Sequence, residues 1–188
     1  MVSGYHARVT NAPTTPDSCR LALPAEAGSI AAVQRRSWQQ LFAPDVARHV
    51  LASVGLDSMT SSWESAIMRP PLAQFRVMVA TAQGRVVGFA ALGPSDDPDA
   101  GSTDGLVAEF VVDPQAQRQG HGSRLLNAVA DTLRADGFTR ATWWVRSTDD
   151  VTRRFVESAG WAPDGSHQTV GTEDESALVK MLRLQTTL

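Results

Sequence analysis

The amino-acid sequence predicts a single α/β domain, with one mixed sheet of six to seven strands and about four flanking helices. Its 188 residues suffice for one hydrophobic core but not for two domains of ordinary size. A hydrophobic fraction of 43% and a charged fraction of 20% are typical of a globular protein. Strand-like segments alternate with segments of helical periodicity, which indicates the α/β class. We expect residues 1–17 to form a mobile N-terminal tail and residues 18–188 to form the domain.

The first half of the chain predicts a strand, three helices and a two-stranded hairpin. In chain order these elements fall at residues 19–24, 25–42, 43–54, 61–68 and 75–92. The helices carry hydrophobic residues at near-helical spacing, and the prolines after Arg69 end the third helix. Gly84 lies between the two strands of the hairpin, where a tight turn favours glycine.

The second half predicts a strand, a helix, a strand, a helix and two final strands. These elements fall at residues 106–112, 123–136, 138–145, 147–160, 167–171 and 177–184. The first helix has a hydrophobic stripe of Leu125, Leu126, Val129 and Leu133, and Gly137 suits its C-terminal end. The second helix has Ser147 as its expected N-cap, and its expected apolar stripe is Val151, Phe155 and Ala159.

Charge and cysteine content argue against several classes of protein. A net charge of −3 disfavours sequence-independent binding to nucleic acids. No apolar run approaches the roughly 20 residues that span a bilayer, and the N-terminus lacks a signal-peptide core. Cys19 is the only cysteine, which rules out an internal disulfide and fits a reducing cytoplasm. Lys180 is the only lysine, a bias typical of a GC-rich bacterial genome. We therefore expect a cytoplasmic protein with neither a nucleic-acid nor a membrane partner.

The segment QRQGHG (117–122) carries two glycines between a predicted strand and a predicted helix. The first turn of a helix offers unpaired N–H groups and the positive end of the helix dipole, which attract anions. Glycine lets the backbone approach a phosphate closely, and Arg118 and Arg124 could add charged contacts. The segment therefore fits a pyrophosphate site. Taken alone, such a pair of glycines is more often a simple turn, since it is neither a Walker loop nor a GxGxxG motif.

Two segments in register resemble the GNAT superfamily of N-acetyltransferases. The segment VVDPQAQRQGHGSRLL resembles the acyl-CoA motif of that family through Val112, Pro114, Gln117, Gly120 and Gly122. The segment DDVTRRFVESAGW resembles its second motif through Asp149, Phe155, Glu157, Gly160 and Trp161. The resemblance covers about half of the chain.

The resemblance implies a mostly antiparallel sheet in which two neighbouring strands splay apart to hold the acyl-CoA. The pantetheine arm would lie in this gap like an extra strand, and loop N–H groups would bind the pyrophosphate. A strand N–H would polarise the thioester carbonyl. The implied cofactor-binding residues are Phe110, Val111, Val112, Gln117, Arg118, Gln119, Gly120, His121, Gly122, Ser123, Asp149, Arg153 and Phe155.

Two positions depart from the family pattern. The family often has a tyrosine as general acid where this chain has Val156, and Tyr5, the only tyrosine, lies in the expected tail. A CoA thiol has a pKa near that of cysteine, roughly 8.5, so its thiolate leaves without an acid. Asp149 replaces a common asparagine, which removes a donor and adds a negative charge near an anionic cofactor.

Glu109 is the candidate general base, because it is a charged residue within an apolar strand beside the expected thioester site. Burial would raise the pKa of its carboxyl toward a useful value. The alternative is that Glu109 points outward to solvent or to a partner. Family members often place a catalytic glutamate three residues earlier, at Leu106, and that offset changes the strand face unless a bulge intervenes.

Other candidates have a structural and a functional interpretation. For His121 we favour a structural role over a phosphate contact, and for His167 a solvated loop over the acceptor site. The tryptophans are expected in the core, with at most one of Trp143, Trp144 and Trp161 lining the acceptor pocket. The acidic segment favours a solvated loop over a rim that attracts a cationic amine, and it contains Asp96, Asp97, Asp99 and Asp104.

The sequence therefore predicts an acetyl-CoA-dependent N-acetyltransferase that acts on a small-molecule or peptide amine and needs no metal. One alternative is a catalytically silent member that senses acyl-CoA, which the missing tyrosine favours. An enzyme that acetylates aminoacyl-tRNA would need a basic surface, which the net charge opposes. The C-terminal strands could mediate a homodimer.

Overall fold

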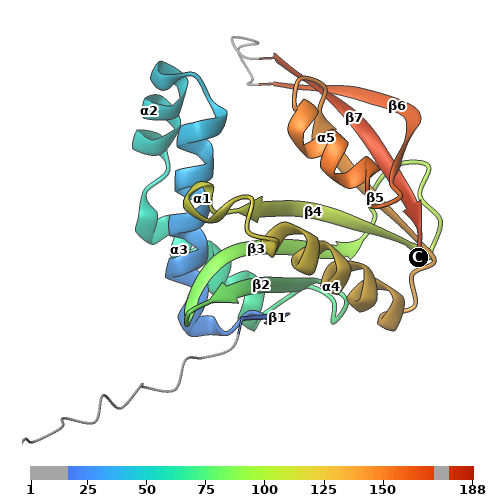
Figure 1. Cartoon of the computed structure of the whole chain (residues 1–188), viewed down its shortest axis with the longest axis horizontal. Coiled ribbons are helices and arrows are strands. Elements are labelled where there is room, and N and C mark those ends of the chain that lie inside the picture. The colour runs from blue at the N-terminus through green and yellow to red at the C-terminus, as the bar shows by residue number, and fades with distance from the viewer. Residues whose placement is uncertain (1–16, 172–177) are drawn as a thin grey trace, which may run out of the picture.

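A computed structural model describes residues 17–171 and 178–188 of the chain. Within these residues, seven strands form one sheet in the order β1-β2-β3-β4-β5-β7-β6 (Figure 1). Neighbouring strands are antiparallel except β4 and β5, which are parallel. The strands are β1 (Ser18–Leu21), β2 (Arg76–Ala82), β3 (Arg85–Pro94), β4 (Asp104–Val112), β5 (Arg140–Arg146), β6 (Ala162–Gly171) and β7 (Leu178–Thr187). The predicted mixed, mostly antiparallel sheet of six to seven strands is confirmed.

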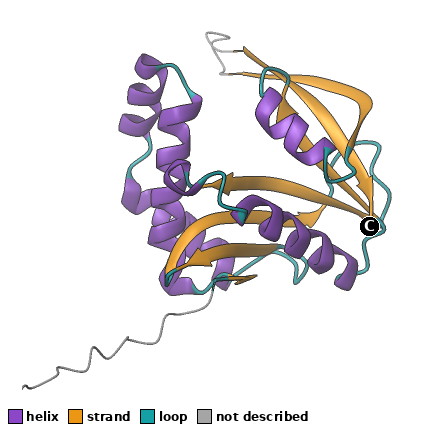
Figure 2. Ribbon diagram, in the orientation of Figure 1, coloured by secondary structure: helices purple, strands orange, loops and turns teal. Residues whose placement is uncertain are grey.

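The described residues form five α-helices, where about four were expected. They are α1 (Ala27–Leu41), α2 (Pro44–Ser53), α3 (Leu56–Met68), α4 (His121–Ala135) and α5 (Asp150–Glu157). The first three lie on one side of the sheet, and α4 and α5 lie on the other (Figure 2). Two hydrophobic clusters fill the interfaces, one under α1 and α3 and a larger one under α4 and α5.

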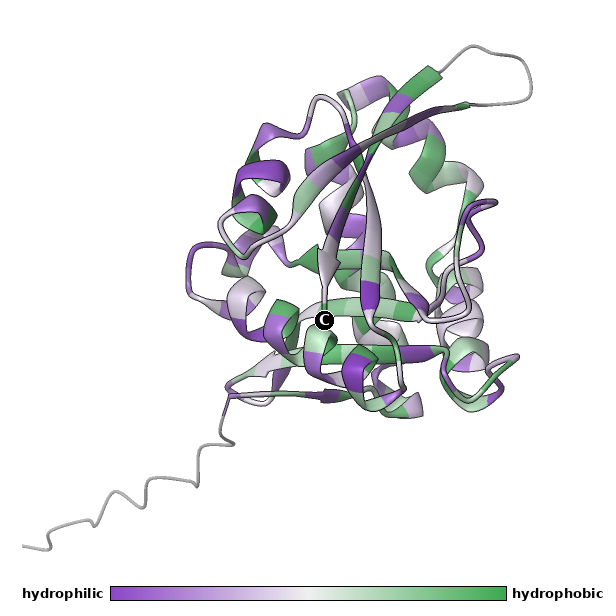
Figure 3. Ribbon diagram, turned by 90° about the vertical axis from the view of Figure 1, so that its right-hand side faces the viewer, coloured by the Kyte–Doolittle hydropathy of each residue, from purple (hydrophilic) through white to green (hydrophobic). Residues whose placement is uncertain are grey.

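The pattern of α4 explains how this helix packs. Its predicted stripe is buried throughout and joins residues of β2 to β5 and β7 in the larger cluster. The central strands beneath it are coloured mostly hydrophobic in Figure 3. Gly137 follows the helix with φ +90°, a conformation that glycine adopts without strain.

Two elements begin five residues before the predicted position. α3 begins at Leu56 rather than at residue 61, because Met59 is its only buried residue and its first turns show no apolar periodicity. β6 begins at Ala162 rather than at residue 167, because an exposed edge strand carries little hydrophobic signal. A hydrophobic pattern appears in the sequence only where residues are buried, and few residues of α3 and β6 are buried.

The N-terminus and the packing of α5 also differ from the prediction. Asp149, not Ser147, is the N-cap, since its carboxylate accepts a hydrogen bond from the backbone N–H of Thr152 at 3.0 Å. The buried residue of this helix is Val156, whereas Val151 is 75% exposed. Of the expected stripe only Phe155 packs against the larger cluster, so the helix rests on the sheet through Phe155 and Val156 rather than through Val151 and Ala159.

The predicted tail lies outside the described residues apart from Asp17. Its carboxylate accepts a hydrogen bond from the backbone N–H of Gln83 and pairs with Arg124, both at 3.3 Å. Gln83 and Gly84 have positive φ and form the predicted turn between β2 and β3. None of the helices in the described ranges has the length and apolar character that crossing a membrane requires.

Candidate functional site

The parallel strands β4 and β5 are paired only at their N-terminal ends. Their register runs from Asp104 opposite Arg140 to Val107 opposite Trp143. Beyond this point β4 stays paired with β3, and β5 stays paired with β7, so the two strands diverge (Figure 1). Among the described strands, none pairs with the β5-facing edge of residues 108–112. This is the splayed pair that the sequence analysis expected, and a free edge can bind an extended molecule.

A bulge at Ala108 sets the direction of the side chains in the splayed part of β4. Val107 pairs with Leu92, whereas Glu109 pairs with the adjacent Ala91. Val107 packs in the cluster under α4, but Val111 packs in the cluster under α1. In a regular strand, residues four apart share one face, so the bulge reverses the alternation. Because of the bulge, Glu109 lies on the same face of the strand as Leu106, three residues earlier.

The loop between β4 and α4 presents a row of backbone N–H groups. Arg118 and Gly120 both have positive φ, +64° and +81°, and Gly120 immediately precedes α4. Within the part of the chain that the structure describes, no acceptor bonds the N–H groups from Gln117 to Ser123. The side chains of residues 117–119 and of Ser123 are exposed. The loop therefore has the geometry of an anion site made mainly of backbone.

An ion pair that the sequence analysis did not identify ties this loop to α1. The buried carboxylate of Asp113 accepts hydrogen bonds from Arg36 at 2.5 and 3.1 Å, and from the backbone N–H of Gln115 at 3.0 Å. Burial raises the pKa of the Asp113 carboxyl, but these hydrogen bonds outweigh it and hold the pKa below its ordinary value. The Asp-Pro pair signals the turn, whereas no local pattern connects Asp113 with Arg36.

His121 and Gly122 open α4 and pack inward. The ring of His121 is buried and its Nδ1 lies 2.5 Å from a guanidinium nitrogen of Arg124, which fits the structural role favoured from the sequence. A Cβ on Gly122 would lie 3.4 Å from the ring of Phe155 and 3.5 Å from Val112. A Cβ at this position would therefore make ordinary van der Waals contacts with α5 and β4, and the packing here does not itself require glycine.

Three aromatic rings lie on the α4 side of the gap between β4 and β5. The ring of Phe110 is 5.0 Å from that of Trp143 and 6.2 Å from that of Phe155. Trp143 also contacts Trp161 edge-on, and both indoles are buried in the core. Phe110 and Phe155 therefore border the gap, while Val111 offers it only backbone atoms.

Glu109 lies on the opposite face, which α1 covers. Its half-buried carboxylate accepts a hydrogen bond through Oε1 from Gln34 Nε2 at 3.3 Å. Gln34 in turn accepts a hydrogen bond through Oε1 from the indole Nε1 of Trp63 at 2.8 Å. Burial raises the pKa of Glu109, and the hydrogen bond from Gln34 partly offsets that rise. Gln34 was missed, although a polar residue on the buried face of α1 is a signal.

The polar side chains Asp149 and Arg153 of the second motif are engaged in hydrogen bonds within the protein. Asp149 uses its carboxylate to cap α5, bonding the backbone N–H and the hydroxyl of Thr152. Arg153 donates to the carbonyl of Ser147 and to Asp150. Val156 is fully buried in the larger cluster, so the position of the usual tyrosine faces the core, and Tyr5 lies outside the described residues.

Much of the acidic segment is exposed, as expected of a solvated loop, but three of its carboxylates pair with arginines of the sheet. Arg183 on β7 is 4% exposed and donates to Asp97, Asp99 and Asp164 at 2.5–3.2 Å. Trp144 donates from Nε1 to Asp97 at 2.8 Å, and Asp104 pairs with Arg140. A buried guanidinium needs several acceptors, and the segment supplies them. Asp96 is exposed, and His167 is exposed on β6 rather than in a loop.

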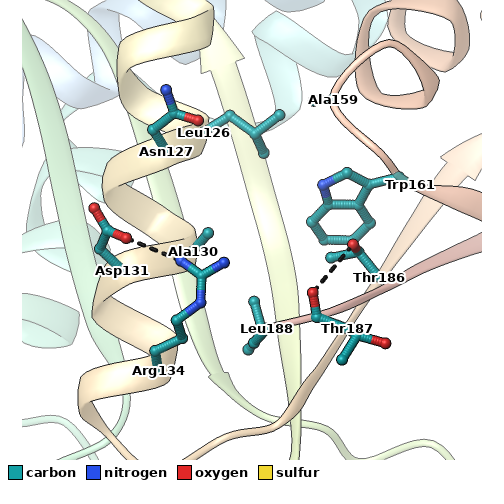
Figure 4. Close-up of a pocket in the computed structure, with 10 residues that line it drawn as sticks. All are labelled: Leu126, Asn127, Ala130, Asp131, Arg134, Ala159, Trp161, Thr186, Thr187 and Leu188. Carbon is teal, nitrogen blue, oxygen red and sulfur yellow. Dashed lines mark hydrogen bonds and ion pairs between the residues drawn. The ribbon is translucent and has the colours of Figure 1, made fainter.

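A separate hollow of about 360 Å³ lies between α4, the turn after α5 and the end of β7 (Figure 4). Leu126, Asp131, Arg134, Trp161 and Leu188 are among its lining residues, and none of the predicted cofactor-binding residues lines it. In the described ranges, no group of three or more His, Cys, Asp or Glu side chains is arranged to hold a metal ion.

Comparison with known proteins identifies one family. The family model described as "Acetyltransferase (GNAT) family" matches residues 38–161. This range contains β4, the loop, α4 and α5, and hence both motifs recognised in the sequence. No curated protein matches the chain.

Many solved structures share the fold. The protein yncA from Salmonella typhimurium, solved with acetyl-CoA as its cofactor, matches with a TM-score of 0.69 and 19% identity over 92% of this chain and 94% of its own. The PaiA N-acetyltransferase from Thermoplasma acidophilum, solved in complex with coenzyme A, matches with a TM-score of 0.69 and 12% identity over 93% of this chain and 100% of its own. A GCN5-related N-acetyltransferase from Kribbella flavida matches with a TM-score of 0.67 and 22% identity over 92% of this chain and 98% of its own. At these identities the likeness establishes the fold alone.

Proposed function

Because the chain belongs to the acetyltransferase (GNAT) family, we propose that it moves an acetyl group from acetyl-CoA to a primary amine of a small molecule or peptide by direct attack. The observation that carries the proposal is the continuity between the free edge of β4 and the free N–H groups before α4. A long cofactor arm that ends in a pyrophosphate fits such a path. Two relatives of the same fold were solved with acetyl-CoA or coenzyme A.

The loop fits a pyrophosphate in both charge and shape. N–H groups from Gln117 to Ser123 and the N-terminus of α4 supply donors and partial positive charge. Gly120 has no Cβ and no atom lies within 4 Å of where one would stand, so phosphate oxygens can approach the backbone. Arg118 is exposed beside it and can add a charged contact.

The unpaired edge of β4 would bind the pantetheine arm through backbone hydrogen bonds, as an added strand. Phe110 and Phe155 would exclude water on the α4 side of the arm. The acceptor amine would then approach from the face that carries Glu109. Asp149 and Arg153 would act by fixing the N-terminus of α5, since both side chains are already bonded within it.

Glu109 is the proposed general base. Acetyl-CoA supplies an activated acetyl thioester when bound. As the amine nitrogen forms its bond to the acetyl carbon, Glu109 takes the amine proton, and the C–S bond breaks with its electron pair on sulfur. The raised pKa of Glu109 suits a base that works near neutral pH. The thiolate leaves without a tyrosine acid because its pKa is roughly 8.5.

Thiol release from acetyl-CoA, measured across a panel of small and peptidyl primary amines, tests the proposal. We expect turnover with at least one amine, and about a 100-fold lower kcat/KM for Glu109→Gln with CoA affinity retained.

The buried Val156 favours one other candidate, a silent acyl-CoA sensor. A rise in Tm with CoA but no turnover of any amine would support the sensor against the enzyme. The cytoplasmic location and the homodimer stay predictions.

A further inference from the structure

We infer that Gln34 positions the carboxylate of Glu109 for proton transfer, and that Trp63 fixes the Gln34 amide in the orientation that this requires. The inference rests on the proposed function, in which Glu109 is the base. The three side chains come from α1, α3 and β4 and meet on the face of β4 opposite the aromatic rings. Gln34 and Trp63 are positioning residues, because they act through Glu109.

The chemistry of the indole determines the orientation of the amide. An indole nitrogen can only donate a hydrogen bond, so the Gln34 atom 2.8 Å from Trp63 Nε1 must be the amide oxygen. The amide nitrogen is then the atom that faces Glu109, at 3.3 Å. A flipped amide would place two oxygens against each other and two N–H donors against each other. The chain Trp63–Gln34–Glu109 therefore has one favourable arrangement.

Packing holds this arrangement in place. The side chain of Gln34 is buried, and the residue is only 6% exposed. Trp63 packs edge-on against Phe89 with ring centroids 5.0 Å apart, and Phe89 is fully buried. Because both side chains are already ordered, little rotamer entropy is lost when the carboxylate is held.

The hydrogen bond from Gln34 occupies only one oxygen of Glu109. It is the one hydrogen bond to that carboxylate within the described residues, and it ends on Oε1. Oε2 is thus the atom that can accept the proton of an attacking amine. A fixed Oε1 sets the plane of the carboxylate and hence the direction in which Oε2 presents its lone pairs.

Charged groups on the neighbouring elements are engaged elsewhere. On α1, Arg35 donates to the carbonyls of Leu51 and Val54, and Arg36 pairs with Asp113. On β7, Arg183 binds its three carboxylates, and Glu64 of α3 is exposed. Burial and the hydrogen bond from Gln34 are accordingly the two influences on the pKa of Glu109, which act in opposite directions. Removing Gln34 leaves burial unopposed.

Selective 13C labelling of glutamate side chains measures the pKa of Glu109 directly, with the resonance assigned by its loss in Glu109→Gln. We expect the pKa of Glu109 to move to higher pH in Gln34→Leu, and in the same direction in Trp63→Phe, which keeps the ring contact with Phe89 but removes the indole donor. Gln40→Leu, the same change on the exposed side of α1, should leave the pKa unchanged. This readout needs no acceptor and stands even if the enzyme hypothesis fails.

The pH profile of kcat/KM for a turned-over amine separates positioning from structural damage. Gln34→Leu should move the midpoint of the profile to higher pH and, because the carboxylate is no longer held in place, should leave kcat/KM about tenfold below wild type on the high-pH plateau. A misfolded variant instead loses activity equally at every pH. An unchanged Glu109 pKa in both variants, or a pH-independent loss in both, overturns the inference. Trp63→Phe keeps the test decisive should Gln34→Leu fail to fold.

Discussion

Gly120 meets two separate requirements at one position. Its φ of +81° is a conformation that other residues adopt only with strain, and the space beside it is open. We expect Gly120→Asp to weaken CoA binding by more than tenfold, because a side chain fills the approach of the phosphate and a negative charge repels it. Isothermal titration calorimetry with CoA measures the effect.

Gly137 provides a matched control at the other end of the same helix. It has φ +90° and open space, so Gly137→Asp imposes comparable backbone strain far from the loop. The two variants should lose similar stability, whereas only Gly120→Asp should lose affinity. Equal affinity of the two variants for CoA would remove the loop from the binding site.

Glu109 illustrates a conflict between stability and activity. Its pKa is raised in the folded protein, so its contribution to stability is complete below the ordinary pKa of 4.5 and is lost as pH rises through the raised value. We expect Glu109→Gln, which is always neutral, to raise Tm at pH 7.5 by about 2–4 °C while abolishing most activity. The gain should disappear near pH 4, and differential scanning calorimetry at both pH values measures it. A gain that is the same at both would contradict the raised pKa.

At the scale of elements, the loop before α4 depends on α1. Arg36→Met would leave the Asp113 carboxylate, 8% exposed, without its charged partner. Breaking a buried ion pair costs ~3–5 kcal/mol, and the 35% exposure of Arg36 reduces this to about 2 kcal/mol. We expect that loss in urea unfolding, together with about tenfold weaker CoA binding, because a looser loop must be ordered on binding.

Arg48→Met is the control for this element. Arg48 pairs with Asp45 on the exposed face of α2, with side chains 77% and 90% exposed, so its removal should change stability by less than about 0.5 kcal/mol. If Arg36→Met behaved like Arg48→Met in both measurements, the anchoring of the loop by α1 would be wrong.

The elements also show what the sequence could predict. The hydrophobic stripe of α4 could be predicted from the sequence because one face of the helix is buried along its whole length. The bulge at Ala108 and the ion pair Arg36–Asp113 could not be predicted, because each depends on a partner strand or helix far away in the chain. The first motif located the loop, and a charge within an apolar strand singled out Glu109, whereas Gln34 and Trp63 emerged only when α1 and α3 were placed against β4.

Across the whole molecule, Arg183 joins segments that the chain order separates. It links the loop between β3 and β4 to β6 and β7 through Asp97, Asp99 and Asp164. The hydrogen bonds from Arg183 lower the pKa of Asp99 to about 2. Asp164 also has a lowered pKa, since hydrogen bonds from Ser166 and Arg183 outweigh its burial. Asp104, paired with Arg140, shifts in the same direction.

These lowered pKa values make the fold sensitive to acid. A carboxylate with a lowered pKa contributes stability that is present above its unfolded pKa, 3.8 for aspartate, and is lost as pH falls through the folded value. We therefore expect the free energy of unfolding to fall steeply between about pH 4 and pH 2, as measured by urea unfolding at fixed ionic strength. Arg183→Met should be less stable at pH 7 by about 3 kcal/mol, because it leaves buried carboxylates unpaired. Its stability should also change less over the acid range, since Asp99 loses the hydrogen bonds that lower its pKa. Parallel curves for wild type and Arg183→Met would show that the acid sensitivity arises outside this network.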